Sequence, residues 1–173
     1  MRTDTPLTFA LKPIGHVVTE VSDEDIPRRR RELVSEVLIL PEYVPGLAGL
    51  EAYSHLIVIF WMDRAPPCTE LLIPASAERG RPTVGTFAMR TRNRPNPLGL
   101  AVVDLLEINH DRLKVRRLDA WNGTPVVDLK PYDFYDIHPD IRVPEWSNSA
   151  RPTRTFDLQP AAPDTPTAPD GVK

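Results

Sequence analysis

The sequence predicts a mainly β protein, a small single-domain β-barrel with short helical turns. Several short segments are rich in β-branched and aromatic side chains and are separated by turn residues. Twenty prolines are spread through the chain and leave little room for long helices. At 173 residues, the chain is long enough for one packed core and short for two. Many short strands in one domain favour a sheet that closes, or nearly closes, into a barrel.

The expected strands follow one another along the chain with a few helical turns between them. The strongest is Ser54–Met62, a continuous apolar run that predicts a strand buried on both faces. Asn109–Arg112 predicts the turn of a hairpin between the strands on either side. Ser22–Asp25 indicates a loop, and short helical turns are expected within Glu42–Leu50 and Pro139–Ser147. The other strands are expected at Pro13–Glu20, Leu33–Leu40, Thr83–Arg90, Leu98–Ile108, Leu113–Leu118 and Pro125–Leu129.

The composition changes at both ends of the expected barrel domain, which spans residues 13–150. Residues 1–12 are expected to be a flexible N-terminal segment, and they lack the apolar stretch of a secretory signal. Residues 151–173 form a proline-rich tail that we expect to be disordered or loosely packed. No apolar run approaches the roughly 20 residues that span a bilayer. The single Cys68 excludes an internal disulfide, so a cytoplasmic protein is expected.

Two common kinds of site lack their sequence signatures. The four histidines, His16, His55, His110 and His138, are far apart, and no HxxxH or CxxC spacing occurs, so no metal site is expected. The Walker loop and the GxGxxG fingerprint of nucleotide-binding proteins are also absent. His55 is alone in an apolar strand and is expected to be a buried histidine satisfied by backbone or by a carboxylate.

The most informative stretch is Arg90–Asp104, RTRNRPNPLGLAVVD. Arg94 and Asn96 each precede a proline, which holds them in an extended conformation. Between residues 79 and 103 there are five arginines and no acidic residue, although the whole chain has a net charge of −3. Such a patch favours a polyanionic partner such as phosphate. The alternative is a solvated edge strand whose charges prevent aggregation between sheets. The Arg28–Arg31 run has the same two interpretations, a second phosphate contact or an exposed basic loop.

A second unusual segment, Leu118–Tyr132, is centred on a predicted turn. Asn122-Gly123 is a tight-turn signal, and Thr124 follows it directly. Such a turn would expose backbone N–H groups and a threonine hydroxyl, which could hold the ribose hydroxyls and amino group of a nucleoside-like ligand. Asp119 and Asp128 flank it. A plain hairpin turn is the alternative interpretation.

Together, these two segments resemble the signature of the TrmO (TsaA-like) family of bacterial and archaeal proteins, RSPxRPNPIGLS followed downstream by DxxDGTPVxDIKPY. The resemblance covers most of the body, from Pro13 to Tyr132. The chain departs from the signature at Thr91-Arg92, which replaces Ser-Pro, and at Asn122, which replaces aspartate. The matching residues are Ile14-Gly15, Pro27-Arg28, Gly49–Glu51, Ser54-His55, Arg90, Arg94–Leu100, Asp119, Gly123–Val126, Asp128 and Lys130–Tyr132.

The resemblance implies an S-adenosylmethionine-dependent methyltransferase built on a small β-barrel rather than a doubly wound sheet. It also implies a homodimer with the cofactor near the subunit interface. The implied reaction is methylation of N6 of threonylcarbamoyladenosine at position 37 of tRNA, beside the anticodon. Two alternatives stay open: a noncatalytic RNA- or nucleotide-binding barrel, and a methyltransferase for a different acceptor.

The resemblance and the chemistry of the donor together indicate a set of cofactor-binding residues. The donor's sulfonium is cationic, so an aromatic face or a carboxylate should lie near it, and the candidates are Phe87, Trp121 and Asp119. Arg90 or Arg28 would hold the methionine carboxylate. The expected cofactor set is Pro27, Arg28, Arg29, Met62, Asp63, Phe87, Arg90, Asn96, Leu100, Asp119, Asn122, Gly123 and Thr124.

The acceptor nitrogen must lose a proton, and a nearby carboxylate could accept it as general base. Asp128 is the first candidate and Asp63 the second, with a purely structural role in the turn as the alternative for Asp128. Contacts to the RNA are expected from Arg92, Arg94, Lys130 and Tyr132.

Overall fold

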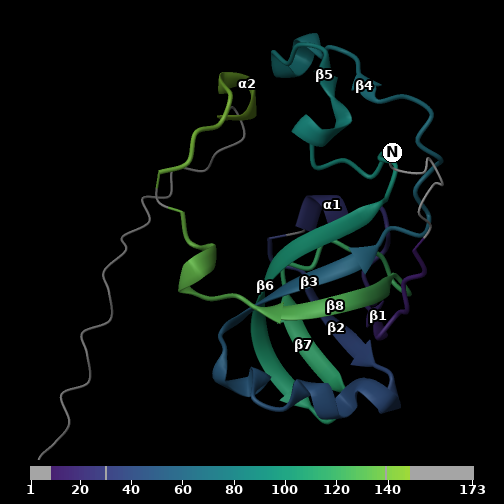
Figure 1. Ribbon diagram of the computed structural model, residues 1–173, viewed down its shortest axis with the longest axis vertical. Helices are drawn as coiled ribbons and strands as arrows, with labels where there is room; N and C mark the ends of the chain where they lie inside the picture. Colours follow the sequence, from purple (N-terminus) through teal and green to yellow (C-terminus); the bar gives the residue numbers. More distant parts are fainter. Residues whose placement is uncertain (1–8, 30, 139, 149–173) are drawn as a thin grey trace, which may run out of the picture.

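The computed structural model describes residues 9–29, 31–138 and 140–148. Six antiparallel strands form a closed barrel in the order β1-β2-β7-β6-β3-β8, which confirms the predicted fold class (Figure 1). The predicted tail over 151–173, and the first eight residues of the predicted N-terminal segment, lie outside the described residues. The barrel strands are β1 Gly15–Val18, β2 Val34–Ile39, β3 His55–Trp61, β6 Leu98–Asn109, β7 Arg112–Arg116 and β8 Pro125–Pro131.

Side chains alternate between the barrel interior and its surface, and the core consists of the inward set. In β3, Leu56, Val58 and Phe60 are buried, whereas Ile57 and Ile59 between them are only half-buried. The prediction that this strand is buried on both faces is therefore wrong. Because β3 belongs to a single closed sheet, only its inward side chains reach the core, and its apolar run reflects strand-forming side chains rather than two-sided burial.

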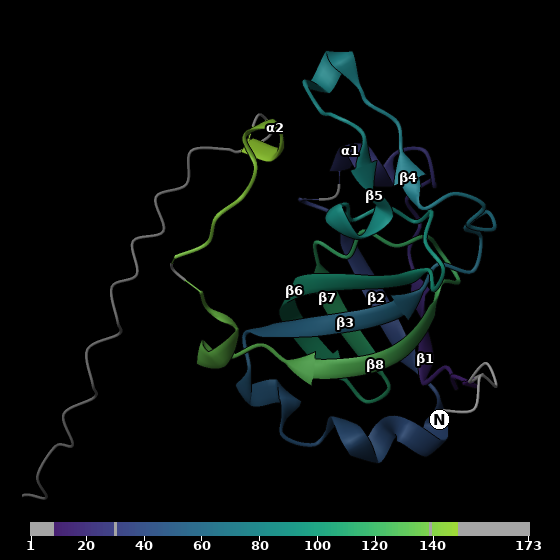
Figure 2. The ribbon, with the colours of Figure 1, turned by 45° about the horizontal axis from the view of Figure 1, so that its top comes forward.

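Helical turns lie at the two ends of the barrel. Two 3₁₀ helices, η1 Pro41–Leu47 and η2 Leu50–Ala52, match the turns predicted there and lie below the barrel in Figure 2. Their Leu47 is buried in the core. At the other end, the helical turn α1 (Ile26–Arg29) begins directly after the segment predicted as a loop, and Ile26 is fully buried.

Residues 71–88 leave the barrel and form a small separate sheet. Its strands β4 (Leu72–Ile73) and β5 (Val84–Gly85) lie above the α1 end of the barrel in Figure 1. The longer strand predicted over Thr83–Arg90 is wrong, because a 3₁₀ turn, η4 (Thr86–Ala88), follows β5 at once. The buried Thr86 holds this turn, since its hydroxyl donates to the carbonyl of Asn93 at 2.6 Å. A further 3₁₀ turn, η3 (Ala77–Arg79), lies between the two short strands.

The last part of the described chain has little regular structure. The predicted turn after Asn109 joins β6 to β7, with His110 at a positive φ of 54°. After β8, a capping box on Asp133 stabilises the 3₁₀ turn η5 (Phe134–Asp136). The turn predicted over 139–147 is the helical turn α2 (Glu145–Asn148), with residue 139 outside the described residues. Among the described helices, none is long and apolar enough to cross a membrane.

Candidate functional site

A cleft opens in the barrel wall where strand β6 leaves its neighbour β7. Strand β6 pairs with β3 from Leu98 to Asp104, but it pairs with β7 only from Asp104 to Asn109. The first half of β6 therefore has one edge without a strand partner. A cavity of about 420 Å³ lies along this edge, within the roughly 300–1,000 Å³ that is usual for ligand pockets.

Gly99 and Phe60 lie at the base of this cavity, opposite each other on the paired strands β6 and β3. A Cβ placed on Gly99 would come within 2.2 Å of two atoms of the Phe60 ring. Only glycine allows the ring to pack this closely against the β6 backbone. The glycine of the RPNPLG segment thus determines the shape of the cavity.

The arginine-rich segment forms one rim of the cavity. Arg90 donates from Nη2 to the carbonyl of Leu100 on the open edge of β6, at 2.5 Å. Arg94 donates a longer bond to the carbonyl of Met89, at 3.5 Å. The amide of Met62 donates to the carbonyl of Pro97 at 2.8 Å, which ties the segment Pro95-Asn96-Pro97 to the end of β3. The bonds to the Leu100 and Met89 carbonyls therefore hold both guanidinium groups beside the cavity, near an edge that the strand pairing leaves open.

A smaller cavity of about 60 Å³ adjoins the first, and Phe60, Met62 and Asp119 line both. Its far side is formed by the turn that follows β7. We call the two together the joined cavity. The smaller part is also lined by Asp63, Arg64, Ala65, Arg92, Ala120, Trp121 and Thr124.

The turn at Trp121–Thr124 is held by hydrogen bonds within the protein. The amide of Thr124 donates to the carbonyl of Trp121, and Gly123 has the positive φ of 80° that this turn requires. The amide of Gly123 donates to the carbonyl of Val17 at 2.8 Å. The expectation that this turn exposes backbone N–H groups is therefore wrong for residues 123 and 124. The turn contributes Trp121 and Thr124 to the cavity instead.

Trp121 contacts two guanidinium groups. Those of Arg64 and Arg92 lie 5.7 Å and 5.4 Å from the centre of its ring, within cation–π range. Arg64 is held in place by Asp23 at 2.8 Å and by the carbonyl of Asn122 at 3.0 Å. The aromatic ring is thus an established partner for cationic groups at this end of the site.

The two parts of the joined cavity differ in charge. The larger part is lined by three arginines, Arg90, Arg94 and Arg117. The smaller part is lined by Asp63 and Trp121 and also by Arg64 and Arg92, and Asp119 lies where the two parts meet, so only the larger part has an excess of arginines. The guanidinium groups suit the anionic groups of a ligand, and the carboxylates of Asp63 and Asp119 suit a cationic group. Within the described residues, no group of three or more His, Cys, Asp or Glu side chains is placed to hold a metal ion.

The structure brings nine of the predicted site residues to the joined cavity. They come from the arginine-rich segment, the end of β3, the open edge of β6 and the turn after β7, which are far apart in sequence. The residues are Met62, Asp63, Arg90, Arg92, Arg94, Leu100, Asp119, Trp121 and Thr124.

Other predicted residues lie elsewhere. Leu129 packs against the core, so the alternation of β8 turns Asp128 and Lys130 to the outer surface, where they form an ion pair at 2.7 Å. The Asp128 carboxylate also accepts from the amide of Leu129. Tyr132 lies beside the ring of His55, with the ring centres 6.2 Å apart.

Several of the predicted cofactor contacts are also separate from the joined cavity. Asn96 lines an apolar hollow on the outer surface, together with Phe9, Trp61 and Pro125. Phe87 is exposed on the segment of residues 71–88, which carries β4 and β5. Asn122 and Gly123 build the turn but do not line either cavity, and Pro27, Arg28 and Arg29 line a hollow of their own around α1.

Sequence reasoning missed Arg64 and Arg117, both of which line the joined cavity. Neither belongs to a recognisable motif: Arg64 comes shortly after the apolar strand β3, and Arg117 directly follows β7, in which basic and apolar residues alternate. The prediction for His55 is correct in its partner and wrong in its burial. Its Nε2 lies 3.2 Å from the Asp104 carboxylate, but 42% of its side chain is exposed.

Comparison with known proteins gives a consistent family assignment. The family model described as the tRNA-methyltransferase O N-terminal domain matches residues 20–136. An S-adenosyl-L-methionine-binding protein of Archaeoglobus fulgidus is 44% identical over 125 residues, which cover 70% of this chain and 88% of that protein.

Solved structures show the same fold. A crystal structure of TrmO matches with a TM-score of 0.66 and 31% identity, over 79% of this chain and 64% of that one. A crystal structure of TrmO from Pseudomonas aeruginosa matches with a TM-score of 0.63 and 32% identity, over 79% and 61%. The chain therefore spans a little under two thirds of each solved chain.

Proposed function

Because this chain belongs to the TrmO family, we propose that it is an S-adenosylmethionine-dependent methyltransferase that modifies tRNA. The observation that carries the proposal is the lining of the joined cavity, which has arginines in both parts and adds the carboxylates of Asp63 and Asp119 and the Trp121 ring. The acceptor we propose is N6 of threonylcarbamoyladenosine at position 37. We further propose that the protein works in the cytoplasm as a homodimer.

The residues of the joined cavity fit the chemical groups of this cofactor. A guanidinium suits the methionine carboxylate, and Arg90 is held at the rim by its bond to Leu100. Asp119 and Trp121 suit a sulfonium, since a carboxylate and an aromatic face both attract cations. The apolar wall at Met62 and Leu100 suits the adenine ring. When bound, the cofactor supplies an activated methyl group.

The acceptor nitrogen must lose its proton, and the geometry favours Asp63 as the base. Asp63 lines the joined cavity and is exposed to it. Asp128 lies on the outer surface, where Lys130 and the amide of Leu129 occupy its carboxylate. Within one chain we therefore place Asp63 ahead of Asp128, the reverse of the order that the sequence favours. Asp128 would reach a reacting group only across a subunit interface.

The outer face of β6 supports the proposed dimer. Leu98, Leu100 and Val102 alternate with inward residues along this strand, and each is at least 38% exposed. Three apolar side chains in a row on one strand face are more than a monomer needs to expose. A second copy packed there would border the cavity, because the same three residues line its edge.

Two measurements test this proposal. Calorimetry with S-adenosylmethionine should show binding, and Asp119→Asn should weaken it by about tenfold, or roughly 1.4 kcal/mol. Arg112→Ala is the control, because Arg112 pairs with Glu36 on the barrel exterior. Transfer of labelled methyl groups should then occur to tRNA from a strain that lacks this protein, and nucleoside analysis should find the label on threonylcarbamoyladenosine.

The possible failures point to different alternatives. If the purified protein takes up no S-adenosylmethionine, the methyltransferase assignment fails and a noncatalytic RNA-binding barrel remains. If the label appears in another nucleoside or only in a small metabolite, the enzyme assignment stands and the acceptor is wrong.

A further inference from the structure

The backbone of Arg117 has a conformation that is unusual for its residue type. Among the described non-glycine residues, only His110 and Arg117 have a positive φ, and that of Arg117 is 78°. His110 lies in the tight turn of a hairpin, where such a value is common. Arg117 instead directly follows strand β7, and its amide still donates to the carbonyl of Leu33 beside β2. A left-handed backbone conformation is disfavoured for a residue that has a side chain, and residues in this conformation concentrate at functional sites.

This conformation shifts the alternation of side chains by one position. Leu113 and Val115 are buried in the barrel, so strict alternation would also bury residue 117. The buried residues that follow are Leu118 and Ala120 instead. As a result, Arg116 and Arg117 are both kept out of the core and both reach the same carboxylate.

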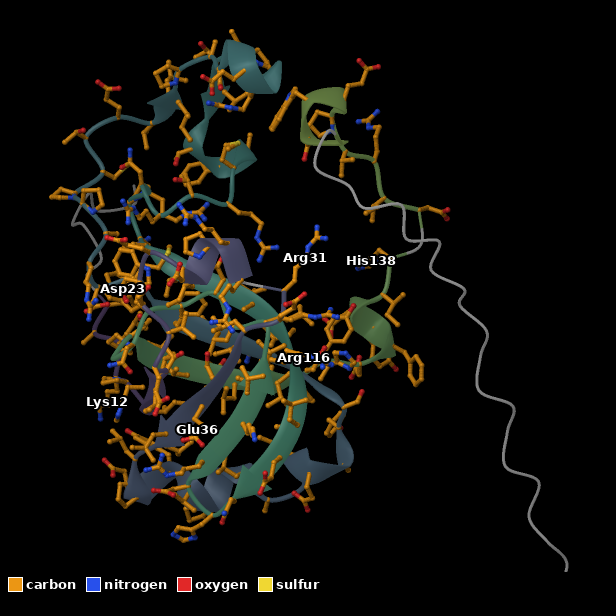
Figure 3. The ribbon with its side chains drawn as sticks, turned by 180° about the vertical axis from the view of Figure 1, so that it is seen from behind. Lys12, Asp23, Arg31, Glu36, Arg116 and His138 are labelled. Atoms are coloured by element: carbon orange, nitrogen blue, oxygen red, sulfur yellow. The ribbon has the colours of Figure 1, made fainter. Side chains whose placement is uncertain are left out.

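That carboxylate belongs to Asp104, which has 11% of its side chain exposed. Its Oδ2 accepts from Nε and Nη2 of Arg116, each at 2.6 Å, while Nε of Arg117 lies farther away, at 3.7 Å. Arg116 therefore neutralises most of this negative charge. Arg117 is positioned by Asp104 but keeps its donors for another partner. Arg116 is labelled on this wall in Figure 3, between Arg31 at the α1 end and Glu36 toward the opposite end.

Arg117 shares the larger cavity with Arg90 and Arg94. In the described part of the chain, each of the three guanidinium groups has one protein partner: the Leu100 carbonyl for Arg90, the Met89 carbonyl for Arg94 and Asp104 for Arg117. A guanidinium carries five N–H donors, so most of their hydrogen-bonding capacity is unused. Asp119 is the single acidic residue among those that line this cavity.

We propose that Arg117, together with Arg94, binds the phosphodiester backbone of the acceptor RNA at the rim of the larger cavity. The inference rests on the proposed function and adds a residue that neither the motifs nor the family signature indicates. The cofactor's single carboxylate needs only one guanidinium group, that of Arg90, whereas an RNA strand brings successive phosphates that can engage the other two. On this interpretation, the strained backbone of Arg117 places a second guanidinium group for the RNA beside that of Arg94.

The test is Arg117→Gly in the full chain, because glycine adopts a φ of 78° without a penalty. The substitution removes the guanidinium and leaves the backbone path intact. The probe is an anticodon stem-loop RNA, titrated over a series of salt concentrations, with S-adenosylmethionine affinity and thermal unfolding measured on the same preparations. Arg112→Gly would disturb a strand, so Arg112→Ala is the control for losing one positive charge on the exterior.

We expect Arg117→Gly to weaken RNA binding about fivefold or more and to lower the slope of log K against log salt by about one. The melting temperature should be unchanged or higher, and the affinity for S-adenosylmethionine should be unchanged. Arg117→Lys should keep the salt slope but bind less tightly, because it retains the charge and loses the fork. Arg112→Ala should leave the RNA affinity within about twofold.

Four results would overturn the proposal. RNA affinity and salt slope equal to those of the unmodified protein would remove Arg117 from the RNA site while leaving the methyltransferase assignment intact. A selective loss of S-adenosylmethionine affinity would assign Arg117 to the donor's carboxylate. A large drop in melting temperature would show that the residue is structural. If the unmodified protein itself binds no RNA at low salt, the tRNA acceptor fails along with this inference.

Discussion

Replacement of Gly99 by alanine tests whether the contact between β6 and Phe60 shapes the site. The two residues are paired across β6 and β3, and the new Cβ would lie 2.2 Å from both Cε2 and Cζ of the ring. Ordinary carbon–carbon contact needs about 3.5–4.0 Å, so the overlap exceeds 1 Å. Phe60 is 5% exposed and is packed within the core cluster, so the ring cannot move further inward. It must turn into the cavity that it lines.

The cost follows from two opposing terms. Forcing a core side chain off its preferred position costs about 1–3 kcal/mol, while removing a glycine from a strand recovers roughly 0.5–1 kcal/mol. A net loss of about 1–2 kcal/mol corresponds to a melting temperature about 3–8 °C lower for a domain of this size. The displaced ring should also weaken the binding of S-adenosylmethionine, because it occupies part of the cavity.

Thermal and urea unfolding of four proteins measure this coupling: the unmodified chain, Gly99→Ala, Phe60→Leu and the double variant. Leucine lacks the outer ring atoms that the alanine Cβ would meet, so the double variant should be about as stable as Phe60→Leu alone. The expected coupling energy therefore equals the net cost of Gly99→Ala, about 1–2 kcal/mol. If the two substitutions are additive, or if Gly99→Ala unfolds at the same temperature as the unmodified chain, the steric explanation for this glycine is refuted.

Two further predictions use matched controls. Gly123→Ala should destabilise the protein by about 1–2 kcal/mol through its φ of 80° alone, since the nearest atom to the new Cβ is Nη2 of Arg64 at 4.0 Å. Gly46→Ala, which meets no atom within 4 Å and has no positive φ, should change the urea midpoint very little; equal effects at both sites would contradict the backbone argument. Asp104→Asn should cost about 1–2 kcal/mol, because a nearly buried carboxylate loses its charged bonds to Arg116. Glu36→Gln, in the exposed pair with Arg112, should cost less than about 0.5 kcal/mol by the same unfolding assay, and a similar loss at both sites would show that burial does not matter here.

Local patterns in the sequence were sufficient to predict most of the barrel. Segments such as Leu33–Leu40 and Leu98–Ile108 are strands because β-branched side chains alternate there and turn residues end them. The turn after Asn109 was equally predictable, since polar residues that readily adopt a left-handed conformation separate the two strands. The small sheet of β4 and β5 was not predicted, because two-residue strands leave no periodic pattern.

The candidate site was predictable only in part. The proline-stiffened arginines and the Asn122-Gly123 turn are sequence-local features, and both border the joined cavity. The outward direction of Asp128 was not predictable, because it depends on a register shift where β8 pairs with Ile59 and Phe60 of β3. A shift of one residue turns a side chain to the opposite face of a strand.

The sequence by itself determined most of the barrel strands, the proline restriction on the backbone at Arg94 and Asn96, and the family to which the chain belongs. Those properties depend on backbone restrictions and side-chain periodicity within short segments. The tertiary structure alone decided that β6 separates from β7, that Phe60 packs on Gly99 and that Arg117 adopts a left-handed conformation beside Asp104. These depend on strand register and on contacts between residues far apart in the chain, which no local pattern records.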